Sequence, residues 1–306
     1  RPADALGAEA LRRNLTEMSD RQMGALFPRD ARSLEKFRRV VGTALRVMID
    51  DRLPGPDDVD ARVVSQAEQD HLHWEKMLLG RKGKGEQIPA VLLTPENPNG
   101  TVVVWVHPDG KRSLWHQGRL AEGAQVLLRK GVSILAVDVL LTGEFQGAPR
   151  PAVDPQYAGF TFGYNRPLLA NRVHDILTAV AYARSRAGTK QIDLVGLDKA
   201  GPWVVLARGL CGSEVARTMA DVDRVRFDNV HRTDDEMLLP GALKYGGLPA
   251  FAALAAPGDL YLYHFSGSGQ ELIESAYQAA GRSNPNGSEP LAVGEKVNWS
   301  WLLKKG

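Results

Sequence analysis

One short stretch combines a candidate nucleophile with the backbone pattern that would expose it. Ile192, Leu194 and Val195 form an apolar run typical of a strand, and Gly196-Leu-Asp-Lys-Ala-Gly201 follows as a tight turn. Pro202-Trp-Val-Val-Leu206 then begins an amphipathic helix. Small residues at 196, 200 and 201 allow strand and helix backbones to approach closely, and Asp198 sits at the centre of the turn. An aspartate there can attack carbon and form an ester with the protein.

A carboxylate nucleophile needs a base to activate the water that releases the product, and two histidines are candidates. His264 lies near the end of the predicted strand 260–265, and His107 is the last residue of the apolar run Thr101–His107. We expect His107 to help build an oxyanion-binding loop with Asp109 and Gly110, while the backbone N–H of Lys199 supplies a further donor. The plainer alternative is that His107 orients its own loop and His264 packs at a strand end.

Asp198 also has two plainer interpretations. It could be a buried carboxylate that accepts hydrogen bonds from backbone amides and so stabilises the turn. It could instead mark a site that no longer catalyses anything. Lys199 is adjacent, but neighbouring residues in such a turn point apart, so we expect no ion pair between Asp198 and Lys199.

A long irregular insertion, 143–164, is rich in Gly, Pro and aromatic residues and is placed to cover the carboxyl ends of the strands. We expect a substrate pocket there, lined by Glu144, Tyr164, Trp203 and His231. His231 belongs to the acidic stretch 228–236, which we interpret as a solvated charge run rather than a metal site, because no rigid element fixes the spacing. We expect neither a metal nor a cofactor. Arg172 and Asp175, at i and i+3 of a helix, are expected to form an ion pair.

Composition narrows the class of protein. The 306 residues carry 38 Lys and Arg against 36 Asp and Glu, a net charge of +2, which gives no electrostatic case for binding nucleic acid or an anionic membrane. The single cysteine, Cys211, excludes an internal disulfide framework. No apolar run approaches the roughly 18 residues of a membrane span.

Helical spacing of apolar residues over 1–52 predicts a helical extension, so we divide the chain into residues 1–60, the extension, and 61–306, the main domain. Apolar runs and helical patterns alternate in the main domain, which predicts a parallel, doubly wound sheet that starts with an antiparallel hairpin over 71–95. The predicted strands are 101–107, 132–139, 191–196, 216–225 and 260–265, and the predicted helices are 115–129, 165–186, 204–211, 248–256, 271–280 and 297–303.

This order of elements resembles the α/β-hydrolase fold, and in detail the branch of acetyl xylan esterases and dienelactone hydrolases. The resemblance covers about residues 70–306 and rests on Trp105-Val-His-Pro-Asp-Gly-Lys, Asn171-Arg-Val-His-Asp-Ile-Leu, Leu194-Val-Gly-Leu-Asp-Lys-Ala-Gly and Leu239-Pro-Gly-Ala-Leu-Lys-Tyr-Gly-Gly-Leu-Pro. It implies that Asp198 occupies the nucleophile elbow. It further implies a carboxylic-ester hydrolase, for example of carbohydrate acetyl esters, that needs no cofactor.

The triad that the resemblance implies is degenerate. The nucleophile, normally Ser or Cys, is Asp198; the acid expected after the seventh strand is offered only by Glu271; and residues 281–300, where the family has its histidine, contain none. Haloalkane dehalogenases and epoxide hydrolases resemble this turn and use Asp, but they keep a histidine.

Two hypotheses therefore remain. One is an ester hydrolase with a base recruited from elsewhere, which takes a small-molecule or carbohydrate ester. The other is an inactive hydrolase-like domain that binds a partner or forms part of a larger tandem esterase. A homo-oligomer is compatible with either hypothesis. The resemblance and the absence of an initiator Met at Arg1 favour a secreted or periplasmic location.

Overall fold

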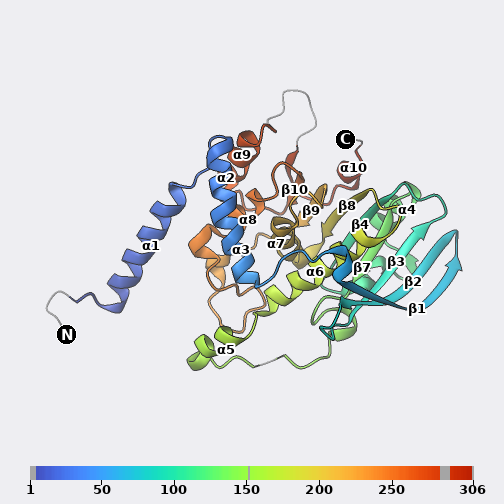
Figure 1. The fold of residues 1–306 in the computed structure, drawn as a ribbon, viewed down its shortest axis with the longest axis horizontal. Helices are drawn as coiled ribbons and strands as arrows, with labels where there is room; N and C mark the ends of the chain where they lie inside the picture. Colours follow the sequence, from blue (N-terminus) through green and yellow to red (C-terminus); the bar gives the residue numbers. More distant parts are fainter. Residues whose placement is uncertain (1–4, 151, 283–289, 305–306) are drawn as a thin grey trace.

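The computed structural model describes residues 5–150, 152–282 and 290–304. Its centre is a nine-stranded sheet in the order β1-β2-β3-β7-β4-β8-β9-β10-β11 (Figure 1). The strands are β1 (Val59–Gln69), β2 (Leu72–Arg81), β3 (Ile88–Pro95), β4 (Thr101–Val106), β7 (Ser133–Val137), β8 (Gln191–Gly196), β9 (Arg217–Asp221), β10 (Asp259–Tyr263) and β11 (Leu291–Gly294). The strands from β7 to β11 pair in parallel, so their carboxyl ends meet at one edge.

Helices cover both faces of the sheet. On one face lie α2 (Ala31–Phe37), α3 (Thr43–Ile49), α6 (Leu168–Ser185), α7 (Gly201–Cys211), α8 (Gly247–Ala253) and α9 (Gln270–Ala279). On the other lie α4 (Glu122–Arg129) and α10 (Trp299–Leu302). Alternate residues of β4 enter the two cores: Val102, Val104 and Val106 face the first, whereas Val103 and Trp105 face the second. This alternation explains why the β4 sequence is apolar throughout.

The predicted parallel, doubly wound sheet with an antiparallel start is confirmed, but the start is larger than a hairpin. β1, β2 and β3 form an antiparallel meander, and β3 pairs antiparallel with β7. The sequence does not predict β1, because every residue after Val59 in this strand is exposed and no alternation of buried apolar residues marks it. β11, also not predicted, is similarly short of buried apolar residues.

The helix predicted over 115–129 is wrong in its first half. Trp115–His116 (β5) and Arg119–Leu120 (β6) form a small hairpin, and α4 begins only at Glu122. Gln117 and Gly118 both have positive φ, 50° and 76°, which is the backbone of a two-residue hairpin turn. The apolar residues of 115–121 therefore pack from a hairpin and a loop, and their helical spacing does not mark a continuous helix.

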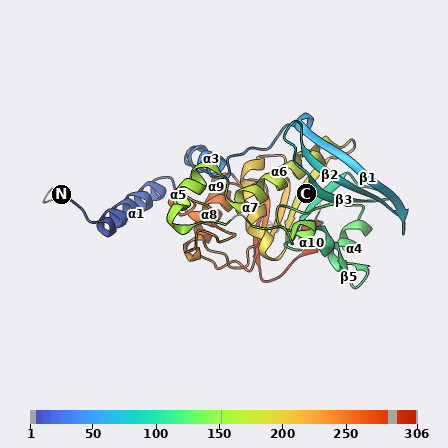
Figure 2. The same ribbon diagram turned by 90° about the horizontal axis from the view of Figure 1, so that it is seen from below.

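The N-terminal extension has two parts. α1 (Ala8–Gly24) buries no residue and projects away from the rest of the molecule (Figures 1 and 2). α2, a five-residue π-helical turn at Arg38–Gly42 and α3 are instead packed into the main core, where Phe37, Leu45 and Ile49 are fully buried. The boundary near residue 60 stays a prediction, since one core joins residues on both sides of it. No helix among the described residues has the length and apolarity that crossing a bilayer requires.

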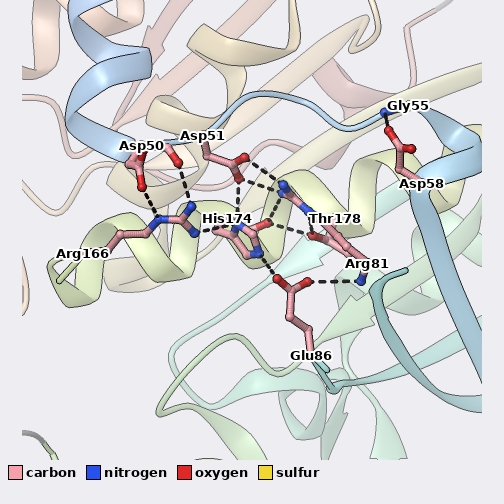
Figure 3. Close-up of polar contacts among 9 residues, drawn as sticks. All are labelled: Asp50, Asp51, Gly55, Asp58, Arg81, Glu86, Arg166, His174 and Thr178. Carbon is pink, nitrogen blue, oxygen red and sulfur yellow. Dashed lines mark hydrogen bonds and ion pairs between the residues drawn. The ribbon is translucent and has the colours of Figure 1, made fainter. Parts of the chain in front are cut away.

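A buried polar network fastens the end of α3 to the main domain (Figure 3). The Asp51 carboxylate accepts two hydrogen bonds from the Arg81 guanidinium, at 2.8 and 2.7 Å. Its Oδ2 also lies 2.8 Å from His174 Nδ1, and His174 Nε2 lies 2.8 Å from Glu86 Oε1. Asp51, at the end of the extension, thereby joins β2 through Arg81 and α6 through His174.

The electrostatics of Asp51 follow from these contacts. Burial works to raise the pKa of Asp51, but the hydrogen bonds from His174 and Arg81 and the charge of Arg81 outweigh it and hold the pKa well below its usual range. Its neighbour Asp50 is different: the carboxylate is 78% exposed and lies 3.2 Å from Arg166. Asp51 and Asp50 therefore each pair with an arginine, Asp51 in a buried contact and Asp50 in an exposed one.

We expect Asp51→Asn to lower the free energy of unfolding by about 3 kcal/mol, because it leaves Arg81 without its buried partner. Asp50→Asn is the matched control and should cost under about 1 kcal/mol. Because the pKa of Asp51 is depressed in the folded state, its contribution is present above the pKa of the unfolded chain, about 3.9. The contribution is lost as pH falls below that value.

Denaturant unfolding of the wild type and both variants from pH 7 to pH 3 measures this directly. The gap between wild type and Asp51→Asn should narrow below about pH 4. Equal losses for the two variants at pH 7 would show that burial of Asp51 adds nothing.

Candidate functional site

The turn that carries Asp198 depends on close backbone contacts. Leu197 N–H donates to Val106 O at 3.0 Å, which ties the end of β8 to the end of β4. A Cβ on Gly201 would lie 1.7 Å from Asp221 O, so the first residue of α7 rests directly on the end of β9. Asp198 is forced into the left-handed region, with φ 52°, and its side chain is exposed. The exposure excludes our alternative in which Asp198 is a buried carboxylate.

A histidine and a second aspartate lie on the neighbouring strands. Asp221 ends β9, and His264 follows β10, which is paired with β9 through Tyr263 and Asp221. His264 Nδ1 lies 2.8 Å from Asp221 Oδ1, and His264 has φ 51°. Asp221 Oδ1 also accepts the N–H of Asp223 at 3.0 Å. Oδ1 of Asp221 is thus fixed by a backbone amide and orients the imidazole ring.

This contact determines which ring nitrogen of a neutral His264 carries the proton. A carboxylate only accepts hydrogen bonds, so Nδ1 carries the proton and donates it to Asp221. Nε2 is then the unprotonated nitrogen, which is the one that can accept a proton. The His264 side chain is 45% exposed, so this nitrogen is not sealed within the core.

His107, which follows β4, is held in the opposite way. The N–H of Asp109 donates to His107 Nδ1 at 2.9 Å, so a neutral ring carries its proton on Nε2 and can donate from there. Burial lowers the pKa of His107 below its usual value, and the charges of Asp109 and Asp198 oppose that effect. The two histidines therefore present different nitrogens: an acceptor at His264 and a donor at His107.

Asp198 lies close enough to act on groups from both sides of its turn. Its charge acts on His107, on the β4 side. On the β10 side, burial and then the charges of Asp221 and Asp198 raise the pKa of Tyr263, the residue before His264. Since β4, β8, β9 and β10 are consecutive in the sheet, His107, Asp198, Asp221 and His264 gather at one edge.

The loop amides that we expected to bind an oxyanion are engaged within the loop itself. Asp109 N–H donates to the His107 ring, and Gly110 N–H donates to His107 O at 2.8 Å. The Asp109 carboxylate accepts from Arg112 at 2.7 Å. Lys199 is exposed and, as expected, forms no ion pair with Asp198 among the described residues. The oxyanion role of Lys199, Asp109 and Gly110 stays a prediction.

The expected pocket residues lie apart from one another. Trp203 is only 2% exposed and packs in the core, with the Arg172 guanidinium 4.2 Å from its ring centroid. Tyr164, at the end of α5 (Ala158–Tyr164), is 88% exposed. His231 is exposed in the loop after β9, and Glu144 pairs with Lys111 at 2.5 Å. The structure does not bring these four residues into one pocket.

Arg172 does not pair with Asp175 as we expected. Its guanidinium donates to Glu236 Oε2 at 2.8 Å and to Leu140 O at 3.0 Å. Asp175 accepts the N–H of Leu140 at 2.8 Å, and burial raises its pKa to about 7. The two side chains are therefore used to fix the 138–142 loop from α6.

The acidic stretch 228–236 is a set of ion pairs in the structure. Asp228 pairs with Arg226, Asp234 with Arg232, and Glu236 with Arg150 and Arg172. Within the described parts of the chain, no three His, Cys, Asp or Glu side chains are grouped as a metal ion would require.

Asp221 is the functional candidate that sequence reasoning missed. It lies inside the stretch 216–225 that we predict as a strand, whereas β9 already ends at Asp221, and nothing in its spacing connects it to a histidine 43 residues later. Only a correct strand end would have singled it out, because an aspartate at the carboxyl end of a parallel strand lies at the edge where ligands bind.

Comparisons with known proteins bear on the fold. No family model matches the sequence, and no curated protein matches it. Solved structures do match. A Bacteroides fragilis protein assigned as an acetyl xylan esterase has a TM-score of 0.61 at 14% identity, over 95% of this chain and 83% of that one.

Two further structures agree. A glucuronoyl esterase from Solibacter usitatus has a TM-score of 0.52 at 13% identity and covers 85% of this chain and 89% of its own. The methylesterase BT1017 has a TM-score of 0.57 at 15% identity and covers 93% of this chain and 63% of its own. The protein therefore has the α/β-hydrolase fold.

The close approach at Gly201 makes a stability prediction. We expect Gly201→Ala to destabilise the protein by about 3 kcal/mol, because the new methyl group must displace the backbone of β9. Gly163→Ala in α5, where a Cβ meets nothing within 4 Å, is the control and should be neutral or slightly stabilising. Denaturant unfolding measures both; similar behaviour of the two variants would contradict the contact.

The proximity of Asp198 to His107 makes a second prediction. The negative charge of Asp198 raises the pKa of His107, so Asp198→Asn should lower that pKa further. Asp60→Asn, an exposed change on β1, should leave it unaltered. An NMR titration of the His107 ring in the three proteins tests this, and the nitrogen chemical shifts also report whether Nε2 carries the proton. An unchanged pKa in Asp198→Asn would place the carboxylate too far away to act.

Proposed function

We propose that the protein is a hydrolase of carboxylic esters of small alcohols in which Asp198 is the nucleophile and His264, oriented by Asp221, is the base. The observation that supports this most directly is the Asp221–His264 pair beside the turn of Asp198. It supplies an unprotonated Nε2 at the sheet edge, which is what an aspartate nucleophile needs in order to be regenerated. The esterases among the solved structures that share this fold support carboxylic esters as the substrate class.

The chemistry of a carboxylate favours attack on the alkyl carbon of the ester. If Asp198 attacked the ester carbonyl, the tetrahedral adduct would expel the carboxylate again, because a carboxylate leaves more readily than an alkoxide. Attack on the saturated carbon avoids this: an Asp198 oxygen bonds to carbon, the carbon–oxygen bond of the ester breaks, and the substrate's carboxylate leaves with the electron pair. The product of this step is an alkyl ester of Asp198.

The second step hydrolyses that ester. Water attacks Cγ of Asp198 while His264 Nε2 takes its proton, and Asp221 stabilises the imidazolium that forms. The tetrahedral adduct collapses, the bond from Cγ to the alkoxy oxygen breaks, and the alcohol leaves with the proton from His264. His107 Nε2–H is the donor that we assign to the oxygen on which negative charge gathers.

The competing hypothesis is an inactive domain that binds a partner. It is favoured by the engaged amides of Asp109 and Gly110 and by the absence of histidine from residues 281–300. The two hypotheses differ in whether Asp198 ever becomes covalently modified.

Intact-protein mass spectrometry during incubation with activated methyl and benzyl esters, alkyl halides and epoxides tests the proposal. We expect turnover by the wild type and an accumulating alkyl adduct in His264→Gln, whose hydrolysis should slow at least about 100-fold. Asp198→Asn should give neither. Asp221→Asn should also slow hydrolysis of the adduct, because His264 loses the carboxylate that orients it. Asp223→Asn, an exposed change two residues later, is its matched control and should behave as wild type.

Isotopic water adds a second readout. In ¹⁸O-labelled water a single turnover should leave the label in Asp198 and none in the carboxylic acid product. Label in the acid product would show attack at the ester carbonyl instead. Absence of both turnover and adduct in every protein would support the binding module, and esterase activity in Asp198→Ser alone would show that only the oxyanion-binding groups had survived.

A further inference from the structure

A cavity of about 480 Å³ lies on the side of the sheet opposite α6, outside the group formed by Asp198, His107 and His264. Val91 of β3 and Trp74 of β2 line it from the sheet. The side that faces the sheet is lined by Trp115 and Lys111, from the segment after β4, and by Glu144, from the segment after β7. The volume is in the range of small-molecule sites.

Two tryptophan rings form one wall of the cavity. Trp74 and Trp115 stack on each other with ring centroids 5.4 Å apart and planes inclined by 28°. Both are partly exposed, and Val91 beneath them is buried. A flat ring that entered the cavity would add to this stack and would replace water against an apolar surface, which is favourable for indole faces.

The charges around the cavity are unequally satisfied. Lys111 Nζ lies 2.5 Å from both Asp138 Oδ2 and Glu144 Oε1, so its charge is fully engaged by two carboxylates. Arg112 holds Asp109. Lys76 is exposed on the Trp74 face of β2 and has no ion-pair partner among the described residues. Lys76 is therefore the one lysine or arginine of the lining that has no ion-pair partner among the described residues.

The contact between Asp138 and Lys111 also fixes one wall of the cavity. Asp138 is fully buried and accepts the N–H groups of Lys111 and Glu144, at 2.7 and 3.0 Å. A Cβ on Gly110 would lie 2.1 Å from Asp138 Oδ1, so the two loops close tightly around this carboxylate. Buried contacts to Asp138 thus hold Lys111 and Glu144, which line the cavity, in place.

We propose that this cavity binds a small planar ring bearing a carboxylate, with the ring stacked on the Trp74–Trp115 pair and the carboxylate paired with Lys76. The stack selects for a flat ring, and the unpaired ammonium of Lys76 favours a carboxylate over a neutral group at that end of the cavity. The proposal is independent of the chemistry of Asp198, and binding can be measured without turnover.

Isothermal titration calorimetry and tryptophan fluorescence with 2-naphthoate and its neutral amide, 2-naphthamide, test it on the full chain. We expect 2-naphthoate to bind more tightly than the amide and to quench fluorescence. Lys76→Gln should weaken 2-naphthoate about threefold and leave the amide unchanged, in keeping with one exposed ion pair. Lys82→Gln, an exposed lysine that follows β2 and does not line the cavity, is the control.

The aromatic wall is tested separately. Trp115→Ala should weaken both ligands at least about tenfold, and Trp115→Phe should recover part of that loss because a ring is restored. Far-ultraviolet circular dichroism and the Tm confirm that each variant folds. Equal binding of acid and amide, an effect of Lys82→Gln equal to that of Lys76→Gln, unaltered binding in Trp115→Ala, or no binding of either ligand would each overturn the proposal.

Discussion

The contact of Gly201 with the carbonyl of Asp221 is the constraint on which the candidate site depends. Only a residue without a side chain allows α7 to start directly against the end of β9. That contact, with the bond from Leu197 to Val106, leaves too little backbone for a relaxed turn, so Asp198 takes a left-handed conformation. A left-handed backbone of this kind persists only where the surrounding structure enforces it.

The sheet then determines what surrounds Asp198. β4 and β9 flank β8, and β10 follows β9, so residues from four separate parts of the sequence reach one edge. Main-chain and carboxylate contacts give the two histidines opposite protonation patterns: the amide of Asp109 fixes His107 as a donor, and Asp221 fixes His264 as an acceptor. Assigning acid and base roles from such differences in environment is more secure than assigning them from residue type.

The sequence predicts an element of the structure well when the residues that mark that element are neighbours in the chain. The buried strands 101–107 and 191–196 and the turn of Asp198 were predicted, because buried apolar runs and closely spaced glycines are features of the local sequence. Exposed strands such as β1 leave no such pattern, and the β5–β6 hairpin was hidden by its apolar spacing. The Asp221–His264 pair joins residues 43 positions apart through strand pairing, which no local pattern encodes.

The partners of the carboxylates separate structural from chemical roles. Asp138 and Asp51 are buried and held by lysine, arginine or histidine, and Asp221 holds a histidine ring in place. A carboxylate tied in this way is poorly placed to attack a substrate, since its lone pairs are already engaged. Asp198 is exposed, is strained and has no side-chain partner among the described residues, while its neighbours are oriented by others. A nucleophile must keep its lone pairs free while the groups around it stay fixed, and this contrast argues for chemistry at Asp198 over a purely structural turn.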